Sequence, residues 1–278
     1  MTRPMPLPRI LIIAGSDSGG GAGIQADIKT VTMLGGHAMT AITAITAQNT
    51  RGVEGVHALP PRFVVQQMAC VADDIGVDAV KIGMIGGAET VNAVADELAS
   101  GLYAAPIVFD PVMIATSGAV LADDATIAAM DRLARMAAMV TPNLPELAAL
   151  TGADVTTPDA AIAAGRDYAA RIGGTVLVKG GHADGATVID RLVDTTGEVA
   201  RWEGARIETR NSHGTGCTLA SGIATGLGAG LSAPAATERA IRFVRAALHA
   251  APGLGSGHGP MGHALGLAPF DLLEGRDA

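Results

Sequence analysis

Short apolar runs and helix-like stretches alternate along most of the chain, and this alternation most limits the folds that the sequence can adopt. The apolar runs predict strands at residues 9–14, 39–47, 77–82, 106–109, 139–140 and 175–178. Helical patterns lie at about residues 22–34, 61–75, 88–99, 125–137, 145–150, 159–172, 216–227 and 235–250. Strands that alternate with helices of ~10–15 residues form βαβ units, in which helices cover both faces of a parallel sheet. The pattern therefore predicts an α/β protein with three αβα layers and a mostly parallel central sheet.

The remaining segments add a hairpin and a tail. Residues 186–193 and 199–207 predict a β-hairpin that turns at residues 195–197. We see no internal repeat and no linker, so we predict a single domain over residues 1–278, with 1–8 and 268–278 peripheral. Residues 252–267 are rich in Gly, His and Pro and predict a loop or a loosely packed tail.

Composition excludes several classes of protein. Hydrophobic residues make up 49% of the chain and charged residues 17%, which excludes a disordered chain. The net charge of −8 argues against nucleic acid as a partner, because binding to a duplex needs a basic surface. Residues 30–50 and 212–237 lack charged side chains, but they are too rich in Thr, Gly and Ser for membrane spans. Two cysteines form no disulfide framework and the first residues carry no export signal, so we expect a cytoplasmic protein without membrane contact.

The segments that follow the predicted strands carry polar residues and glycines. Ligands bind at the carboxyl ends of the strands in an open parallel sheet. These ends bring together Gly15, Gln48, Met84, Asp110, Asn143, Glu146 and Lys179. So many polar loops at one edge favour an active site over a packing accident, and we predict an enzyme.

The first glycine-rich loop resembles a dinucleotide-binding fingerprint. Residues 21–26 (GAGIQA) match G-x-G-x-x-A, but the glycines begin several residues after the strand. The fingerprint also needs an acidic residue ~20 positions further on, and no acid lies between Asp27 and Glu54. An NAD-dependent dehydrogenase is therefore a remote alternative, and no P-loop motif is present.

Residues 213–217 (HGTGC) form the strongest local motif. Backbone N–H groups at a helix N-terminus bind anions, and glycine lets phosphate oxygens approach them. Gly214, Thr215 and Gly216 therefore predict an anion hole. Cys217 would lie in the first turn, where a helix N-terminus lowers the pKa of a thiol enough to make it a candidate base. The alternative is a small buried cysteine in a packed helix.

Three charged residues are candidates for binding a nucleotide. Lys179 ends an apolar strand and could neutralise phosphate charge, although a surface lysine is an equally good interpretation. Asp110 and Glu146 could hold Mg²⁺, which prefers carboxylate oxygens, water and phosphates. The structural alternatives are a turn acid before Pro111 and a favourable charge in the first turn of a helix.

The order of these motifs resembles the bacterial hydroxymethylpyrimidine/phosphomethylpyrimidine kinases of the ribokinase superfamily. The resemblance runs from Ile12 to about Gly262 and is carried by residues 14–27, 41–50, 81–84, 110–113, 141–146, 177–182 and 213–218. One departure is Ser18-Gly19, where the family usually has Pro-Ser, and it predicts a looser loop. The resemblance implies a ribokinase-like fold and a homodimer. It also implies two ATP-dependent phosphorylations, first of 4-amino-5-hydroxymethyl-2-methylpyrimidine and then of its monophosphate, for thiamine biosynthesis.

The resemblance also implies roles for individual residues. Relatives hold the pyrimidine through the residues that match Gly15, Asp27, Gln48 and Met84. ATP would contact Lys179 and Asn143, Mg²⁺ would lie at Asp110 and Glu146, and Cys217 would be the catalytic residue beside the anion hole. We therefore expect Cys217→Ala to impair the first phosphorylation more than the second, and Gln48→Ala to weaken pyrimidine binding. A pyridoxal kinase of the same superfamily is the nearest alternative, and a non-catalytic regulatory binder is a third.

Overall fold

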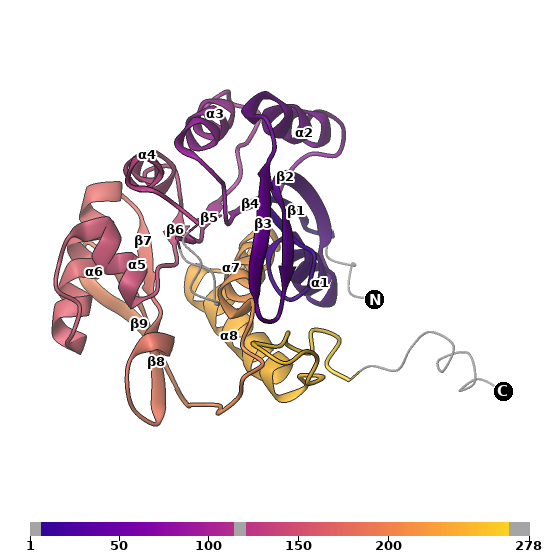
Figure 1. Ribbon diagram of the computed structural model, residues 1–278. Helices are drawn as coiled ribbons and strands as arrows, with labels where there is room; N and C mark the ends of the chain where they lie inside the picture. Colours follow the sequence, from indigo (N-terminus) through magenta and orange to yellow (C-terminus); the bar gives the residue numbers. More distant parts are fainter. Residues whose placement is uncertain (1–6, 114–120, 267–278) are drawn as a thin grey trace, which may run out of the picture.

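A single sheet runs through the computed structural model, which describes residues 7–113 and 121–266 (Figure 1). Its strands are β1 (Arg9–Asp17), β2 (His37–Asn49), β3 (Gly52–Ala58), β4 (Ala79–Ile82), β5 (Ile107–Phe109), β6 (Met139–Val140), β7 (Thr175–Val178), β8 (Thr187–Asp194) and β9 (Gly197–Ala205). They lie in the order β3-β2-β1-β4-β5-β6-β7-β8-β9. The pairs from β2 through β1 to β7 are parallel, whereas β3, β8 and β9 join antiparallel. The prediction of a mostly parallel sheet is confirmed.

Helices cover both faces of this sheet. They are α1 (Gly23–Met33), α2 (Pro61–Asp74), α3 (Ala88–Leu98), α4 (Asp124–Ala134), α5 (Leu144–Thr151), α6 (Pro158–Ile172), α7 (Thr215–Gly228) and α8 (Ala233–His249). Buried side chains of α2 to α6 pack in one hydrophobic cluster, and those of α1, α7 and α8 pack in a second one. The three predicted αβα layers are therefore present, with α2, α3 and α4 drawn above the sheet in Figure 1.

Strand β1 shows why both faces must be covered. Leu11 and Ile13 belong to the first cluster, while Ile10 and Ile12 belong to the second. Successive side chains of a strand point to opposite faces, so a continuous apolar run needs a helix layer on each side. The expected strand at residues 9–14 is thus correct, and it extends to Asp17.

Strand β3 was not predicted. Its sequence contains two glycines and Glu54, and most of its side chains are half-buried or exposed. The strand is held by antiparallel pairing with β2, in which Thr46 lies opposite Val56. An edge strand with a solvated face lacks the apolar run by which buried strands are recognised.

The segment predicted as a loop or a loosely packed tail is irregular, but it is not loose. The backbone N–H of His258 donates to the carbonyl of Thr50 at 2.8 Å, and that of Gly262 donates to Ala247 at 2.9 Å. His213 also donates its backbone N–H to Gly259 at 3.2 Å. These bonds fasten the segment to the β2–β3 turn, to α8 and to the start of α7. Residue 267 and most residues of the two peripheral segments lie outside the described residues.

The same segment is also held by the buried side chain of His263, and from this contact we predict that the protein is sensitive to acid. The His263 ring is buried and its Nε2 lies 2.9 Å from the Thr218 hydroxyl in α7. Burial lowers the pKa of His263 from 6.5 to about 4, so the folded state prefers the neutral ring. The free energy of unfolding should therefore be unaffected by His263 above pH ~6.5. It should fall by up to about 3 kcal/mol as the pH drops toward ~4. Urea unfolding between pH 4 and 7 of wild type and His263→Gln measures this contribution, and an exposed histidine replaced the same way, His57→Gln, is the control. Equal acid sensitivity in wild type and His263→Gln would contradict the prediction.

Among the residues that the structure describes, no helix is long and apolar enough to cross a membrane.

Candidate active site

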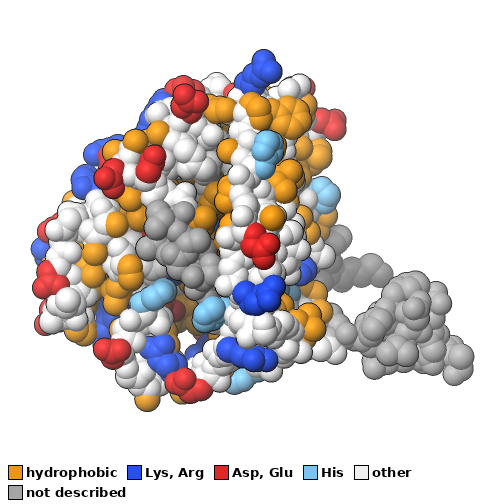
Figure 2. Space-filling view, viewed as in Figure 1, with side chains coloured by type: hydrophobic (Ala, Val, Ile, Leu, Met, Phe, Trp, Pro, Cys, Tyr) orange, Lys and Arg blue, Asp and Glu red, His pale blue; other side chains and the backbone are white. Residues whose placement is uncertain are grey.

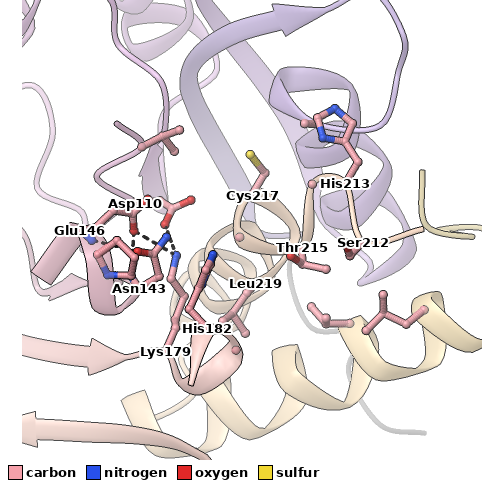
Figure 3. Close-up of a pocket in the computed structure, with 18 of the residues that line it drawn as sticks. Asp110, Asn143, Glu146, Lys179, His182, Ser212, His213, Thr215, Cys217 and Leu219 are labelled. Carbon is pink, nitrogen blue, oxygen red and sulfur yellow. Dashed lines mark hydrogen bonds and ion pairs between the residues drawn. The ribbon is translucent and has the colours of Figure 1, made fainter. Parts of the chain in front are cut away.

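One cavity of about 930 Å³ lies at the carboxyl ends of the parallel strands and beside the start of α7. Gly15, Gln48, Met84, Asp110, Asn143, Glu146, Lys179 and residues 214–217 all line it. All of the predicted site residues except Asp27 therefore line this cavity. Figure 3 shows Asp110 after β5, Glu146 in α5 and Lys179 after β7 facing the start of α7 across it.

The start of α7 has the geometry of an anion site. Gly214 is the N-cap residue with a φ of 86°, and no side chain caps the helix among the described residues. A Cβ at Gly214 would overlap the carbonyl oxygen of Gly21, so only glycine fits there. The first backbone N–H groups of a helix have no intrahelical acceptor. The N–H of Thr215, which belongs to the predicted anion hole, donates to the Ser212 carbonyl at 3.3 Å. The N–H groups of Gly216, also predicted, and of Cys217, which was not, are therefore the ones available to an anion in the cavity.

A cluster of three charged side chains lies next to this helix start. Lys179 Nζ lies 2.8 Å from Asp110 Oδ1 and 3.7 Å from Glu146 Oε2. A Cβ at Gly216 would lie 3.3 Å from Asp110 Oδ2 and 3.4 Å from Lys179 Nζ. The ammonium group and the anion site thus share one wall of the cavity. Because the Lys179 side chain is mostly buried and is held by two carboxylates, the alternative of a surface lysine is wrong.

Asn143 and Glu146 also stabilise the start of α5 beside this cluster. Asn143 Oδ1 accepts the backbone N–H of Glu146 at 2.9 Å, and Glu146 Oε2 accepts that of Asn143 at 2.8 Å. This capping box begins α5. Glu146 therefore lies in the first turn of a helix, as the structural alternative for this residue proposed. Burial raises the pKa of Glu146 to about 7, although Lys179 acts in the opposite direction. A cation bound beside Glu146 would favour its ionised form.

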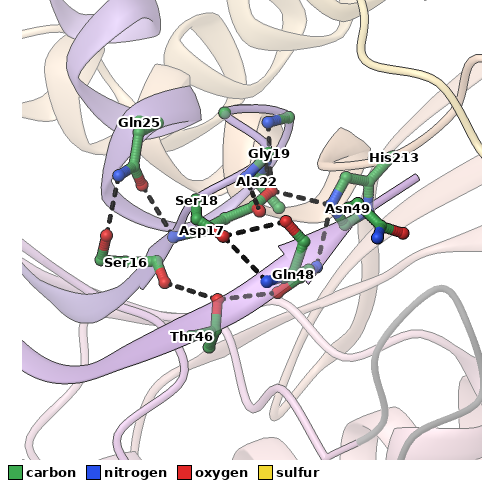
Figure 4. A network of polar contacts seen from close by, with 12 residues as sticks. Ser16, Asp17, Ser18, Gly19, Ala22, Gln25, Thr46, Gln48, Asn49 and His213 are labelled. Atoms are coloured by element: carbon green, nitrogen blue, oxygen red, sulfur yellow. Dashed lines mark hydrogen bonds and ion pairs between the residues drawn. The ribbon is translucent and has the colours of Figure 1, made fainter. Parts of the chain in front are cut away.

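Asp17 lies at the opposite end of the cavity, where it accepts several hydrogen bonds, and no sequence motif pointed to it (Figure 4). Its carboxylate accepts the backbone N–H groups of Gly19, Gly21 and Ala22 at 2.8–3.0 Å. Its Oδ2 also lies 2.9 Å from His213 Nε2. Burial would raise the pKa of Asp17, but the bonds from His213 and the backbone hold it below the ordinary value. No periodicity links residues that are 196 positions apart.

This arrangement contradicts the dehydrogenase alternative. In a dinucleotide-binding fingerprint the backbone N–H groups of the glycine loop face the pyrophosphate. Here Asp17 takes those of Gly19, Gly21 and Ala22. The loop is also firmer than the departure at Ser18 predicted, because the Ser18 hydroxyl donates to the Gln48 carbonyl at 2.9 Å and accepts the Gln48 N–H at 2.8 Å.

Asp27 does not line the cavity, which corrects the expectation that it contacts a substrate. It is fully buried, with its Oδ2 2.8 Å from Lys81 Nζ and its Oδ1 accepting the Ser221 hydroxyl at 2.7 Å. Lys81 is also fully buried; burial lowers its pKa, but the Asp27 carboxylate reverses this and raises it above the ordinary value for lysine. The pair lies in the layer between β4, α1 and α7, and its charges are satisfied there.

Cys217 lies in the first turn of α7, as expected, but its thiol is not activated. Burial raises the pKa of Cys217 to about 11, and the nearby ammonium of Lys81 only partly opposes this. The expectation that the helix start lowers this pKa is therefore wrong. At neutral pH the side chain is a thiol that can orient a neighbouring hydroxyl, rather than a ready thiolate.

An apolar wall completes the cavity and was also missed. Trp202 of β9 lines it together with Val188, Leu219, Ile241, Val244 and Leu248. The three residues from α8 follow at spacings of three and four, so one face of that helix supplies them. A flat aromatic group fits such a wall, and Arg245 and His182 add polar edges.

Comparison with known proteins shows which proteins this chain is similar to. A family model described as phosphomethylpyrimidine kinase matches residues 17–262. The hydroxymethylpyrimidine/phosphomethylpyrimidine kinase of Streptomyces coelicolor is 47% identical, and the match covers 94% of this chain and 96% of that protein. The solved structure of Bacillus subtilis pyridoxal kinase in complex with ADP has a TM-score of 0.85 at 32% identity, and covers 93% of this chain and 98% of that one.

Some relatives are longer than this chain. The thiamine biosynthesis bifunctional protein ThiED of Geobacter sulfurreducens is 46% identical over 94% of this chain, but the match covers 53% of that protein. The chain thus spans about half the length of this relative, and a smaller share of two similar multifunctional proteins.

Proposed function

Because the chain belongs to the phosphomethylpyrimidine kinase family, we propose that it phosphorylates 4-amino-5-hydroxymethyl-2-methylpyrimidine and then the resulting monophosphate, in thiamine biosynthesis. The observation that carries this proposal is that Gln48, the anion site of α7 and Lys179 line one cavity. A ring alcohol beside Gln48 would thereby lie within the same enclosure as a transferable phosphoryl group. ATP as the donor is supported by the ADP complex of the Bacillus subtilis structure.

Phosphoryl transfer needs alignment and charge neutralisation more than covalent chemistry. The backbone N–H groups of Gly216 and Cys217 would hold the moving phosphoryl group, and the Lys179 ammonium would offset its charge. The apolar wall around Trp202 would take the nucleotide base. The apolar wall, by excluding water from its side of the cavity, would strengthen these electrostatic contacts.

The donor set of Asp110 and Glu146 fits Mg²⁺. Mg²⁺ is usually held by one or two carboxylates together with phosphates and water, and these two carboxylates reach the same ammonium group at the cavity wall. Among the described residues there is no group of three or more His, Cys, Asp or Glu that could form an all-protein site. When bound, the ion would neutralise part of the phosphate charge. Asp110 and Glu146 would hold it and keep Lys179 oriented.

We propose that Cys217 orients the hydroxyl group of the first acceptor and does not act as a thiolate. Cys217→Ala should then lower kcat for the first phosphorylation by ~10-fold, and for the second by less, because a phosphate acceptor is already ionised. The kcat of the first step should stay flat between pH 7 and 9. A thiolate base with a pKa of about 11 would instead raise kcat with every pH unit. Steady-state ADP release with each acceptor measures both effects, and Cys217→Ser is the matched control.

A pyridoxal kinase is the second candidate, and the solved structure of a pyridoxal kinase at 32% identity favours it. The higher identity to a protein named for the pyrimidine substrates favours the first proposal. A coupled assay of ADP release on the hydroxymethylpyrimidine, its monophosphate and pyridoxal distinguishes them. Preference for pyridoxal, or turnover of none of the three, would contradict the proposed function.

We further propose that the chain forms a homodimer. Ile45, Val56 and Phe63 are 47–54% exposed on β2, β3 and α2, and Figure 2 shows hydrophobic side chains over α2 and β3. Exposed apolar side chains that gather at a sheet edge favour association. Sedimentation at micromolar concentration should give twice the mass of the chain, and a monomer would contradict the proposal.

A further inference from the structure

The side-chain amide of Gln48 lies between two hydrogen-bonding groups that decide its orientation. As drawn in Figure 4, its nitrogen lies 3.2 Å from His213 Nε2 and its oxygen lies 3.2 Å from the hydroxyl of Thr46. The oxygen and nitrogen of an amide have nearly the same size and are distinguished by the partners that surround them. The protons on these partners therefore show which way the amide must face.

The first partner is His213. Its Nε2 lies 2.9 Å from Asp17 Oδ2, and that oxygen already accepts the backbone N–H groups of Gly21 and Ala22. An ionised carboxylate has no proton to give, so the hydrogen of this contact must be on Nε2. A protonated Nε2 has no lone pair that could accept a hydrogen from Gln48, so an NH₂ group facing it would be unpaired. The Gln48 carbonyl oxygen, in contrast, can share the Nε2 hydrogen with Asp17.

The second partner is Thr46. Its hydroxyl donates to the backbone carbonyl of Ser16 at 2.8 Å, and a carbonyl can only accept. A hydroxyl has one hydrogen, so toward Gln48 the Thr46 oxygen can offer only a lone pair. The Gln48 atom that faces Thr46 must then be the NH₂ group. Two independent neighbours thus require the same orientation, the reverse of the one drawn.

We propose that His213, held by Asp17, and Thr46 together fix the Gln48 amide with its oxygen toward His213 and its nitrogen toward Thr46, and so determine which way round an aminopyrimidine docks. The inference rests on the proposed function and deepens it. His213, Asp17 and Thr46 are positioning residues, which act on the ring through Gln48.

The fixed amide gives the ring a direction. In the proposed substrate a ring nitrogen, the amino group and the hydroxymethyl group follow one another around the ring. The Gln48 N–H pairs with the ring nitrogen and the Gln48 oxygen with the amino group, so the hydroxymethyl group lies beyond the amino group on the His213 side. His213 directly precedes Gly214 at the start of α7 (Figure 3). The alcohol is therefore directed toward the anion site, whereas the reverse amide would direct it toward Thr46.

A matched pair of substrates tests this orientation. The analogue with oxygen in place of the amino group carries a hydrogen on the adjacent ring nitrogen, so its edge shows an acceptor and a donor in reversed order. Against the fixed amide this analogue meets oxygen with oxygen and N–H with N–H. We expect the wild-type protein to prefer the amino compound by at least ~100-fold in kcat/KM, because buried polar groups would otherwise be left unpaired.

Two variants of similar length at position 213 separate hydrogen bonding from shape. His213→Gln keeps an N–H donor near the position of Nε2, and His213→Met fills the space without one. We expect the ratio of kcat/KM for the amino and oxygen compounds to fall at least ~10-fold in His213→Met and to stay within about 3-fold of wild type in His213→Gln. A ratio in His213→Met equal to that of wild type would overturn the inference, as would equal losses in both variants.

Thr46→Val provides a second test that does not alter the start of α7. It removes the acceptor for the Gln48 NH₂ group, and we expect the same fall in the substrate ratio while KM for ATP is unchanged. Wild-type protein that fails to phosphorylate the aminopyrimidine would overturn the proposed function and this inference with it. Active wild-type protein whose ratio is insensitive to both His213→Met and Thr46→Val would overturn the inference alone.

Discussion

Replacing Lys179 with methionine is expected to lower kcat/KM for ATP by about 10³-fold while the protein remains folded. The ammonium of Lys179 is the positive side chain that the structure places beside the anion site, 3.4 Å from the position of a Cβ on Gly216. Methionine has nearly the same length and keeps the packing, so the substitution removes the charge alone. The loss should appear in both phosphorylations, because each must neutralise a phosphoryl group.

The neighbours of Lys179 strengthen this expectation. Without the ammonium, Asp110 and Glu146 would face an anionic nucleotide with no charge between them. Lys29 on α1 is exposed and serves as the matched control, because Lys29→Met removes the same charge outside the cavity. Steady-state kinetics with varied ATP measure the effect, and circular dichroism checks the fold. Activity of Lys179→Met within tenfold of Lys29→Met would argue against the assigned role.

The second large effect is on stability, and it concerns the buried pair of Lys81 and Asp27. Lys81→Met should lower the free energy of unfolding by about 3–5 kcal/mol, because it leaves the Asp27 carboxylate buried without a counter-charge. Both side chains are fully buried, so water cannot compensate. Total stabilities of about 5–15 kcal/mol make this a large share. Urea unfolding monitored at Trp202 measures the change.

A double variant separates the pair from its surroundings. Lys81→Met combined with Asp27→Leu replaces both charges by apolar groups, and we expect it to recover most of the lost stability. Ser221 would lose its acceptor in the double variant, so recovery should fall short of wild type by about 1 kcal/mol. If the double variant were no more stable than Lys81→Met, the loss in the single variant would not come from an unpaired buried carboxylate, contrary to this account.

The strand and helix pattern was readable because it follows from local geometry. Strand β7 begins and ends where the sequence predicted, and helix α6 begins one residue earlier. Its start is marked by Thr157, whose hydroxyl accepts the backbone N–H of Ala160, and by Pro158 in the first turn. Such signals depend on residues within one turn of each other. Strand β3 has no such local signals. It is held in place by its pairing with β2, which only the folded chain provides.

The residues of the candidate site also fall into two groups, those that local sequence signals could select and those that they could not. Gln48, Asp110 and Lys179 could be selected because each follows a predicted strand, and the strand ends of a parallel sheet meet at one edge. Asp17 and His213 were passed over as a pair, since only the folded chain brings their side chains to 2.9 Å.

By itself, the sequence determined the layered architecture, the edge of the sheet at which the cavity forms and the family to which the chain is similar. It did so because hydrophobic periodicity and strand order are properties of neighbouring residues. Only the tertiary structure decided how deeply each polar group is buried and which partner it meets. That is why Asp27, predicted to contact a ligand, is found in a buried ion pair. It is also why the Cys217 thiol is harder to ionise than its position at a helix start suggested. Burial and hydrogen bonding are set by segments far apart in the chain, and they control the chemistry of a charged or nucleophilic side chain.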